Sequence, residues 1–491
     1  MPGKGLIRLL PRREPPRLSR RQFLARSALA TAGAVAAPLV KPKPAQAQAR
    51  QRRPNIIFVL TDDQARWGMG AYGNQFIYTP NMDRLANEGV RFSRGFVCTA
   101  VCSPSRTSFI TGQYPHRHGI MNWLRPTEPG LKPEAMTLSR ALLNAGYRTG
   151  YVGKWHLGVG EGCQPEDHGF EYFMGFLEGG TSPKGATLIE NGEKRKYDDF
   201  LTDVLTQRAI SYCEAHAQEP FFLFLSYRSP HSPYMPVGEQ HLAHYSQDKT
   251  ADWPEVEKKR LEHYASITEV DYDLGLLRQR LEELGLAKDT IIIFCGDNGY
   301  MIGQHDIWHT KGQGQGGNAY DEAYLVPYLV AWPGVIQPAV REEMVCNIDL
   351  LPSVLDLAGG PMPAGYRPDG LSFAPLLRGA EVVAWRDAVF GEMSADYRWE
   401  RDDPKKNLPG TLTENPVRMI RTEQWKYVWR AKTGEQLFDL VKDPGETTNL
   451  VQAPEAQEML GQLKARLRRW QEETGDPILT QGPPDQRRIE G

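Results

Sequence analysis

Pairs of polar residues follow several β-rich, apolar runs of this sequence. Asp62 and Asp63 follow the first run, and Asp297 and Asn298 follow a later one. Adjacent carboxylates repel each other and are costly to bury unless a cation lies between them. Their oxygens suit Ca²⁺ or Mg²⁺, and neither Cys nor His is needed as it is around Zn²⁺. Each Asp alone is better explained as a helix cap or turn residue, but together with the other strand ends they predict a divalent metal site.

Basic and histidine side chains follow two other apolar runs. Lys154 and His156 come after the run that starts at Tyr147, and His231 comes shortly after the run that starts at Phe221. Open α/β sheets bind ligands at the carboxyl ends of their strands. We therefore expect these side chains and the four metal-ligand candidates to meet in one crevice.

The segment from Cys102 to Arg106 places a thiol and a cation one helical turn apart. Pro104 suits a first helical turn, so Cys102 is expected at a helix N-terminus, where N–H groups and the helix dipole favour anions. Arg106 is close enough along the helix to face the same point. The alternatives are a buried structural thiol or a disulfide between Cys102 and Cys98.

The Cys102-x-Pro104-x-Arg106 run, continued by the segment from Thr111 to Pro115, resembles the formylglycine signature of the type I sulfatases in the alkaline phosphatase superfamily. The resemblance extends over nearly the whole chain after the N-terminal leader. Its other segments are Pro54 to Asp63, Gly153 to Gly158, His168 to Phe170, Pro230 to Pro233, Gly296 to Gly299, Leu437 to Leu440, and Asp443 with Pro444.

This resemblance implies that Cys102 is oxidised to formylglycine by a formylglycine-generating enzyme, and that the hydrated aldehyde is the nucleophile. It also implies that the metal is Ca²⁺, with Mg²⁺ as the alternative, and that the metal acidifies the hydrate and neutralises a sulfate oxygen. Arg106 would orient the hydrate. The ligands would be Asp62, Asp63, Asp297 and Asn298.

The remaining catalytic roles are also implied by the resemblance. Lys154 and Lys311 would hold sulfate oxygens, and His231, together with Lys311, would protonate the leaving alcohol. His156 would act on the hydrate when sulfate is expelled. His305 and Trp308 lie near the family motifs and are candidate substrate-binding residues.

The predicted function is therefore hydrolysis of an organic sulfate monoester, an aryl or carbohydrate sulfate, to an alcohol and inorganic sulfate. A phosphonate or phosphate monoester hydrolase of the same superfamily is the enzymatic alternative. A non-catalytic protein that binds sulfated glycans is the alternative from a different class, but it predicts the loss of a catalytic residue.

Alternating strand and helix patterns predict an α/β fold, a large, mixed and mostly parallel sheet flanked by helices. Helical spacing predicts a long helix from Val256 to Leu284. Shorter alternating runs from about Ala384, and an amphipathic helix from Pro454 to about Glu473, predict a smaller C-terminal α+β domain. The predicted strands run from Asn55 to Leu60, Tyr147 to Val152, Phe221 to Leu225, Ile291 to Cys295 and Pro327 to Ala331.

Residues 1–49 have the features of a twin-arginine export signal. They carry ten Lys or Arg and one acid, Arg20 and Arg21 are paired, and small residues from Ala45 to Ala49 form a cleavage site. The predicted domains are thus the signal (1–49), the catalytic domain (50–383), the C-terminal subdomain (384–475) and a flexible tail (476–491). The protein is expected to be exported folded, to the periplasm or outside.

Charge and cysteine content exclude several classes of protein. Removing the +9 of residues 1–49 from the net charge of −2 leaves −11 on the rest, which argues against a general binder of nucleic acid. No other segment approaches 18 apolar residues, so we expect no membrane contact after the signal is removed. Six irregularly spaced cysteines are too few for a disulfide framework. The expected partners are the small organic sulfate and the formylglycine-generating enzyme.

Overall fold

The computed structural model describes residues 53–245, 255–308, 318–380, 382, 384–394, 416–431 and 434–481. The predicted signal segment and Lys311 lie outside these residues. No helix among the described residues is both long enough and apolar enough to cross a membrane.

A ten-stranded mixed sheet forms the centre of the catalytic part, in the order β10-β2-β9-β8-β1-β7-β3-β4-β5-β6. The strands from β8 to β4 in this order are parallel, and so are β10 and β2. Strands β5, β6 and β9 pair antiparallel with their neighbours. The bounds are β1 Asn55–Thr61, β2 Val90–Phe96, β3 Arg148–Lys154, β4 Tyr172–Phe176, β5 Thr187–Glu190, β6 Glu193–Lys196, β7 Phe221–Ser226, β8 Thr290–Gly296, β9 Tyr328–Ala331 and β10 Ala339–Cys346.

The central strands β1, β7 and β8 are buried along their whole length, as expected for parallel strands covered on both faces. Alternate side chains of β1 enter different cores: Phe58 packs in one hydrophobic cluster, and Ile57 and Val59 pack in the other. The continuous apolar runs explain why the sequence predicts these strands to within two residues. The edge strand β10 was not predicted because its charged residues mask the pattern.

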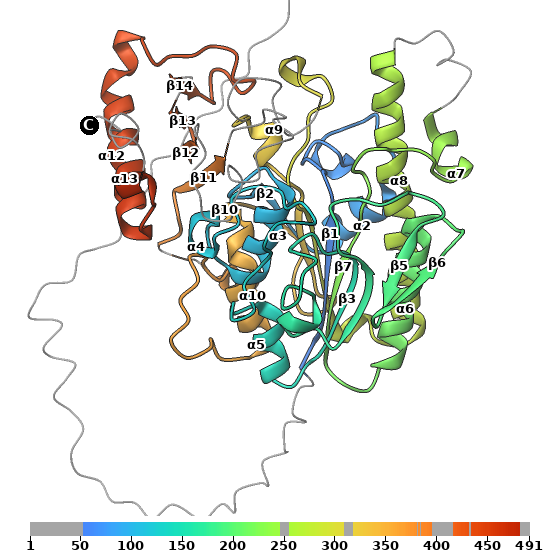
Figure 1. Ribbon diagram of the computed structural model, residues 1–491. Coiled ribbons are helices and arrows are strands. Elements are labelled where there is room, and N and C mark those ends of the chain that lie inside the picture. Colours follow the sequence, from blue (N-terminus) through green and yellow to red (C-terminus); the bar gives the residue numbers. More distant parts are fainter. Residues whose placement is uncertain are drawn as a thin grey trace, which may run out of the picture. The chain divides into compact units, whose positions relative to one another are not determined.

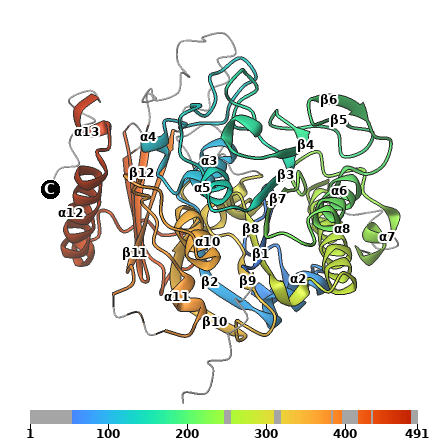
Figure 2. The same cartoon turned by 90° about the horizontal axis from the view of Figure 1, so that it is seen from below.

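Helices cover both faces of the sheet (Figures 1 and 2). Side chains of α3 (Cys102–Thr111), α5 (Leu138–Asn144) and α10 (Leu350–Ala358) belong to one core cluster. Side chains of α2 (Pro80–Glu88), α6 (Leu201–Ala215) and α8 (Glu255–Glu283) belong to the other. The predicted long helix is α8, and the α/β fold class is confirmed. The remaining short helices of this part are α4 Pro115–His118, α7 Glu239–Leu242, α9 Asp321–Tyr324 and α11 Ala374–Leu377.

A second sheet follows, with four antiparallel strands in the order β11-β12-β13-β14, and it confirms the predicted C-terminal α+β architecture. Helix α12 (Gln457–Thr474) buries Leu460, Leu463, Leu467 and Trp470, the apolar face that its sequence predicts. The boundary at residue 384 stays a prediction. The strands are β11 Ala388–Ser394, β12 Pro416–Thr422, β13 Trp425–Arg430 and β14 Gly434–Asp439.

The first residues of the predicted tail are part of this fold, which corrects the prediction for them. Residues Ile478–Gln481 form the short helix α13, and Ile478 is fully buried. Asp476 accepts two hydrogen bonds from Arg418 of β12, at 2.7 and 2.8 Å. The Pro- and Gln-rich composition predicts a loose tail, and a single Asp forms no periodic pattern that would indicate a buried ion pair. Residues 482–491 lie outside the described residues.

A buried lysine connects the C-terminal sheet to the catalytic part. Lys426 of β13 donates to Asp321 of α9 and to Glu446, each at 2.7 Å, and its side chain is fully buried. We expect Lys426→Met to lower the free energy of unfolding by about 3–5 kcal/mol, because it leaves two buried carboxylates facing each other. Urea denaturation measures this loss.

The matched control is Lys442→Met, because Lys442 lies 3.3 Å from Asp439 with its side chain 82% exposed. Exposed ion pairs contribute little to stability, so this variant should unfold at nearly the wild-type urea concentration. Equal losses in the two variants would contradict the role assigned to Lys426.

Candidate active site

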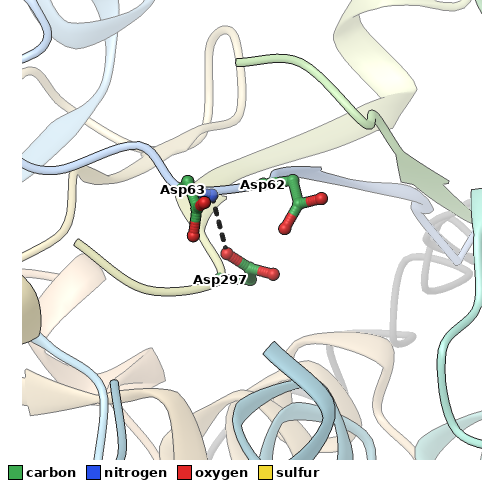
Figure 3. Close-up of side chains that lie close together, drawn as sticks. All are labelled: Asp62, Asp63 and Asp297. Carbon is green, nitrogen blue, oxygen red and sulfur yellow. Dashed lines mark hydrogen bonds between the residues drawn. The ribbon is translucent and has the colours of Figure 1, made fainter. Parts of the chain in front are cut away.

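Three carboxylates converge at the carboxyl ends of two neighbouring strands. Asp62 and Asp63 follow β1, Asp297 follows β8, and the two strands pair in parallel up to Thr61 and Gly296. One oxygen of each carboxylate lies within 4.8 Å of the others, and all three residues are buried. Figure 3 shows them side by side, with the hydrogen bond of 2.9 Å that the Asp63 backbone N–H donates to Asp297 Oδ1.

Burial and mutual repulsion make this cluster electrostatically unstable by itself. Burial raises the pKa of Asp297 well above its ordinary value, and the charges of Asp62 and Asp63 raise it further. Burial also raises the pKa of Asp62, but the charges of Lys154, His231 and Arg106 outweigh burial and hold that pKa below its ordinary value. A cation between the carboxylates would keep all three ionised.

The donor atoms fit a divalent cation. Asn298 Nδ2 donates a hydrogen bond to Asp63 Oδ1 at 2.6 Å. The other side-chain atom of this amide, Oδ1, does not take part in that bond. Asn298 Oδ1 and Asp62 Oδ1 are buried and accept no hydrogen bond from the described residues. Buried polar atoms normally have a partner, and hard oxygen donors are the ligands of Ca²⁺ and Mg²⁺. The four predicted ligands therefore lie together in an arrangement that could hold such an ion.

Two buried cations surround the carboxylates. Lys154, the last residue of β3, donates from Nζ to Asp62 Oδ2 at 2.7 Å. Arg106 donates from Nε to Asp297 Oδ2 at 2.8 Å, and its Nη2 lies 3.5 Å from Asp62 Oδ1. Its Nη1 donates to Ser226 Oγ at 2.7 Å and to the Lys154 carbonyl at 3.0 Å. Arg106 thus joins strands β8, β1, β7 and β3.

Cys102 is the first residue of helix α3, as its sequence context predicts. Helix α3 is held against the carboxylates, because Ser105 donates to the Asp297 carbonyl and Arg106 binds the Asp297 side chain. All six cysteines lie in the described residues and none is paired in a disulfide, so the predicted alternative of a Cys98–Cys102 disulfide is wrong. The Cys98 thiol instead donates to Ser108 at 3.3 Å.

His156 presents one ring nitrogen as a hydrogen-bond acceptor. Its Nε2 lies 3.0 Å from the Leu124 carbonyl, which can only accept, so Nε2 carries the proton. Burial, with the charges of Lys154 and Arg106, holds the pKa of His156 well below its ordinary value. The neutral ring then has a lone pair on Nδ1, which is buried and has no partner among the described residues. This nitrogen can accept a proton from a hydroxyl group.

His231 is more exposed and lies at the edge of the cluster. Its Nδ1 donates to the Ser232 carbonyl at 2.7 Å, and its Nε2 lies 3.8 Å from Asp63 Oδ2. The side chain is 31% exposed, so a bound molecule can approach the ring. In the neutral ring the single proton is on Nδ1, so Nε2 can act as a general acid only when the ring carries both protons.

The other predicted substrate-binding residues lie in the segment after Asn298. His305 stacks on Tyr320 with ring centroids 3.6 Å apart, and its Nε2 lies 3.6 Å from Glu322. Trp308 is half-buried, and its carbonyl accepts a hydrogen bond of 3.5 Å from the Tyr300 hydroxyl. Their roles stay predictions, as does that of Lys311, which lies outside the described residues.

Two buried serines of the site were not predicted from the sequence. Ser226 accepts from Arg106 and donates to the Lys154 carbonyl at 2.8 Å, and Ser105 donates to the Asp297 carbonyl. Ser226 is the last residue of strand β7, so its position after an apolar run could have predicted a place in the site. Nothing in the sequence distinguishes Ser105, because serine is common in a first helical turn.

The comparisons with known proteins identify the family. Residues 54–360 match the sulfatase family model, and residues 317–473 match the model of the C-terminal region of N-sulphoglucosamine sulphohydrolase. The chain therefore belongs to the sulfatase family, a class of sulfuric ester hydrolases, and it is an enzyme of that class.

Individual relatives agree with this assignment. The chain is 30% identical to an ulvan-active sulfatase of Formosa agariphila, over 89% of this chain and 84% of the relative. It is 29% identical to arylsulfatase A of Bos taurus, over 84% of this chain and 87% of the relative. A protein solved with its substrate D-glucosamine-2-N,6-O-disulfate has the same fold, with a TM-score of 0.74, 23% identity, and coverage of 89% of this chain and 100% of that one.

The carboxylate cluster predicts that divalent cations stabilise the fold. Adding Ca²⁺ or Mg²⁺ to chelator-treated protein should raise its unfolding temperature, because an ion at one hundred times its Kd adds about 2.7 kcal/mol. Asp297→Asn should abolish this rise. Differential scanning calorimetry measures both, and Asp387→Asn, whose side chain is 80% exposed, should keep the full rise. An equal rise in all three proteins would exclude the cluster as the binding site.

Proposed function

We propose that this sulfatase cleaves an aryl or carbohydrate sulfate monoester with a formylglycine hydrate at position 102 as the nucleophile and Ca²⁺ at the carboxylate cluster. The supporting observation is the burial of Asp62, Asp63 and Asp297 within 4.8 Å of one another, joined by Arg106 to the helix that Cys102 begins. The relatives named for ulvan and for aryl sulfates support the two substrate classes.

The bound cation would acidify a hydroxyl group of the hydrate and neutralise one sulfate oxygen. Lys154 is placed to hold a second sulfate oxygen, because its Nζ lies 2.7 Å from Asp62 Oδ2 at the same cluster. Arg106 fixes the first turn of α3 and with it the direction of side chain 102. These charges are in place before substrate binds, so little reorganisation accompanies the reaction.

Two histidines divide the proton transfers. His231, through Nε2 of its doubly protonated ring, protonates the oxygen of the leaving alcohol as the S–O bond breaks. His156 accepts, at Nδ1, the proton of the remaining hydroxyl of residue 102 when sulfate is released and the carbonyl forms again. The burial of His156 and the exposure of His231 agree with one acting on the enzyme and the other on the leaving group.

The burial of Cys102 bears on when the modification takes place. Cys102 is 7% exposed, and every residue of α3 is buried. A formylglycine-generating enzyme therefore needs access to this segment before the chain folds. We also propose that residues 1–49, with the paired Arg20 and Arg21, direct export of the folded protein to the periplasm or outside. Modification would then precede export.

The choice of sulfate over phosphate can be measured directly. Wild-type protein should hydrolyse 4-nitrophenyl sulfate with a higher kcat/KM than 4-nitrophenyl phosphate, because among the described residues only one acidic cluster could hold a metal. A phosphoryl dianion benefits from more positive charge than this cluster supplies. A clear preference for phosphate would support the alternative, a phosphate or phosphonate monoester hydrolase.

The mass of the peptide that contains Cys102 tests the nucleophile. Conversion of the thiol to an aldehyde should lower this mass by about 18 Da, as the change of CH₂SH to CHO requires. Cys102→Ala should bind divalent cations as wild type does but lose hydrolysis. Cys163, which is half-buried, serves as the internal control and should keep its mass. Full activity with an unmodified Cys102 would overturn the mechanism.

A further inference from the structure

The segment from Trp123 to Arg125 borders the catalytic residues through the backbone of Leu124. The Leu124 N–H donates to Ser103 Oγ at 3.0 Å, and the Leu124 carbonyl accepts from His156 Nε2 at 3.0 Å. Ser103 is the neighbour of Cys102 in α3. One residue of this segment therefore contacts both the nucleophile's helix and a catalytic histidine.

The side chains of this segment separate into two groups. Leu124 is buried, whereas Trp123 and Arg125 are half-buried. The Arg125 guanidinium lies over the Trp123 indole, 5.4 Å from the ring centroid. Trp123 also packs against the hydrophobic core. The stacking therefore holds the guanidinium on an indole that is itself fixed in place, next to the contacts of Leu124 with Ser103 and His156.

The Arg125 guanidinium forms no ion pair with a carboxylate of the described residues. The neighbouring acid is Glu128, whose Oε2 accepts a hydrogen bond from the Arg125 backbone N–H at 2.7 Å. A planar guanidinium suits bidentate pairing with a carboxylate or a sulfate group. Lys154 and Arg106 are already paired with the carboxylate cluster. Arg125 therefore adds a positive charge that this cluster does not use.

Another border of His156 consists of backbone without side chains. A Cβ added at Gly179 would lie 2.6 Å from His156 Nε2, so a larger residue is excluded there. A Cβ added at Gly180 would meet no atom within 4 Å. The Gly179 backbone therefore packs against the His156 ring, whereas the space beside Gly180 is open.

We propose that Trp123 and Arg125 form a subsite for a sugar that carries a second anionic group next to the sulfate ester. The proposal rests on the function proposed above and narrows its substrate to doubly anionic saccharides. The indole contacts the sugar ring, and the guanidinium pairs with the second anion, either a uronate carboxylate or another sulfate.

Steady-state kinetics on four substrates test this subsite. They are 4-nitrophenyl sulfate, D-glucosamine 6-O-sulfate, D-glucosamine-2-N,6-O-disulfate, and a 6-O-sulfated disaccharide that contains a uronate. Wild type should prefer one of the two doubly anionic sugars to the singly sulfated one. The anion that raises kcat/KM identifies the second group as sulfate or carboxylate.

Arg125→Ala should lower kcat/KM for the preferred substrate about tenfold more than for 4-nitrophenyl sulfate, mainly through KM. Arg125→Lys should recover part of the loss, because lysine keeps the charge but lacks the planar fork. Arg469→Ala, which removes an exposed arginine from α12, is the control and should leave all four rates unchanged.

The outcomes separate this proposal from the proposed function. A wild type that cleaves none of the four sulfates contradicts the proposed function itself. A wild type that cleaves them but prefers the singly sulfated sugar, or an Arg125→Ala that affects all substrates equally, overturns the subsite alone. If Arg125→Ala does not fold, Arg125→Lys and the salt dependence of the wild-type KM test the subsite instead. The KM for the doubly anionic sugar should rise with ionic strength more steeply than the KM for the singly sulfated sugar.

Discussion

The site depends on one electrostatic constraint, the burial of three carboxylates within 4.8 Å of one another. Such a cluster is unfavourable unless positive charge compensates it, because burial and mutual repulsion both oppose ionisation. Lys154 and Arg106 supply two charges from fixed, buried positions. The unsatisfied oxygens of Asp62 and Asn298 leave a place for a further cation. The same positive charges that stabilise the carboxylates also favour an anionic sulfate group.

The sheet explains how distant residues meet this constraint. Strands β8, β1, β7 and β3 are consecutive neighbours in the sheet and parallel, so the polar residues after each of them lie at the same edge. Arg106 extends from α3 and contacts residues at all four strand ends. These contacts fix the first turn of α3 and therefore the position of Cys102. Cys102 and the three clustered carboxylates are therefore positioned relative to one another by a single buried guanidinium.

Much of this arrangement could be predicted from the sequence, for physical reasons. The central strands are continuous apolar runs, and the residues after them carry charge, so both the strands and their polar ends are visible. Asp476 could not be predicted, because its partner Arg418 lies 58 positions away and neither residue belongs to a periodic pattern. The contacts of Leu124 were equally hidden, because backbone atoms form them and any residue type could supply the same bonds.

The C-terminal sheet contributes to the site through contacts that extend to the loop of Asp297 and Asn298. The Gly299 N–H, next to Asn298, donates to the Ala323 carbonyl of α9 at 2.9 Å. This approach needs glycine, because a Cβ at position 299 would lie 2.0 Å from the Glu322 carbonyl oxygen. Helix α9 is in turn held by the ion pairs of Asp321 with Lys426 and Arg421, both of the C-terminal sheet. A four-residue helix has little stability of its own. The second sheet therefore fixes α9, and α9 fixes the loop that carries Asp297 and Asn298.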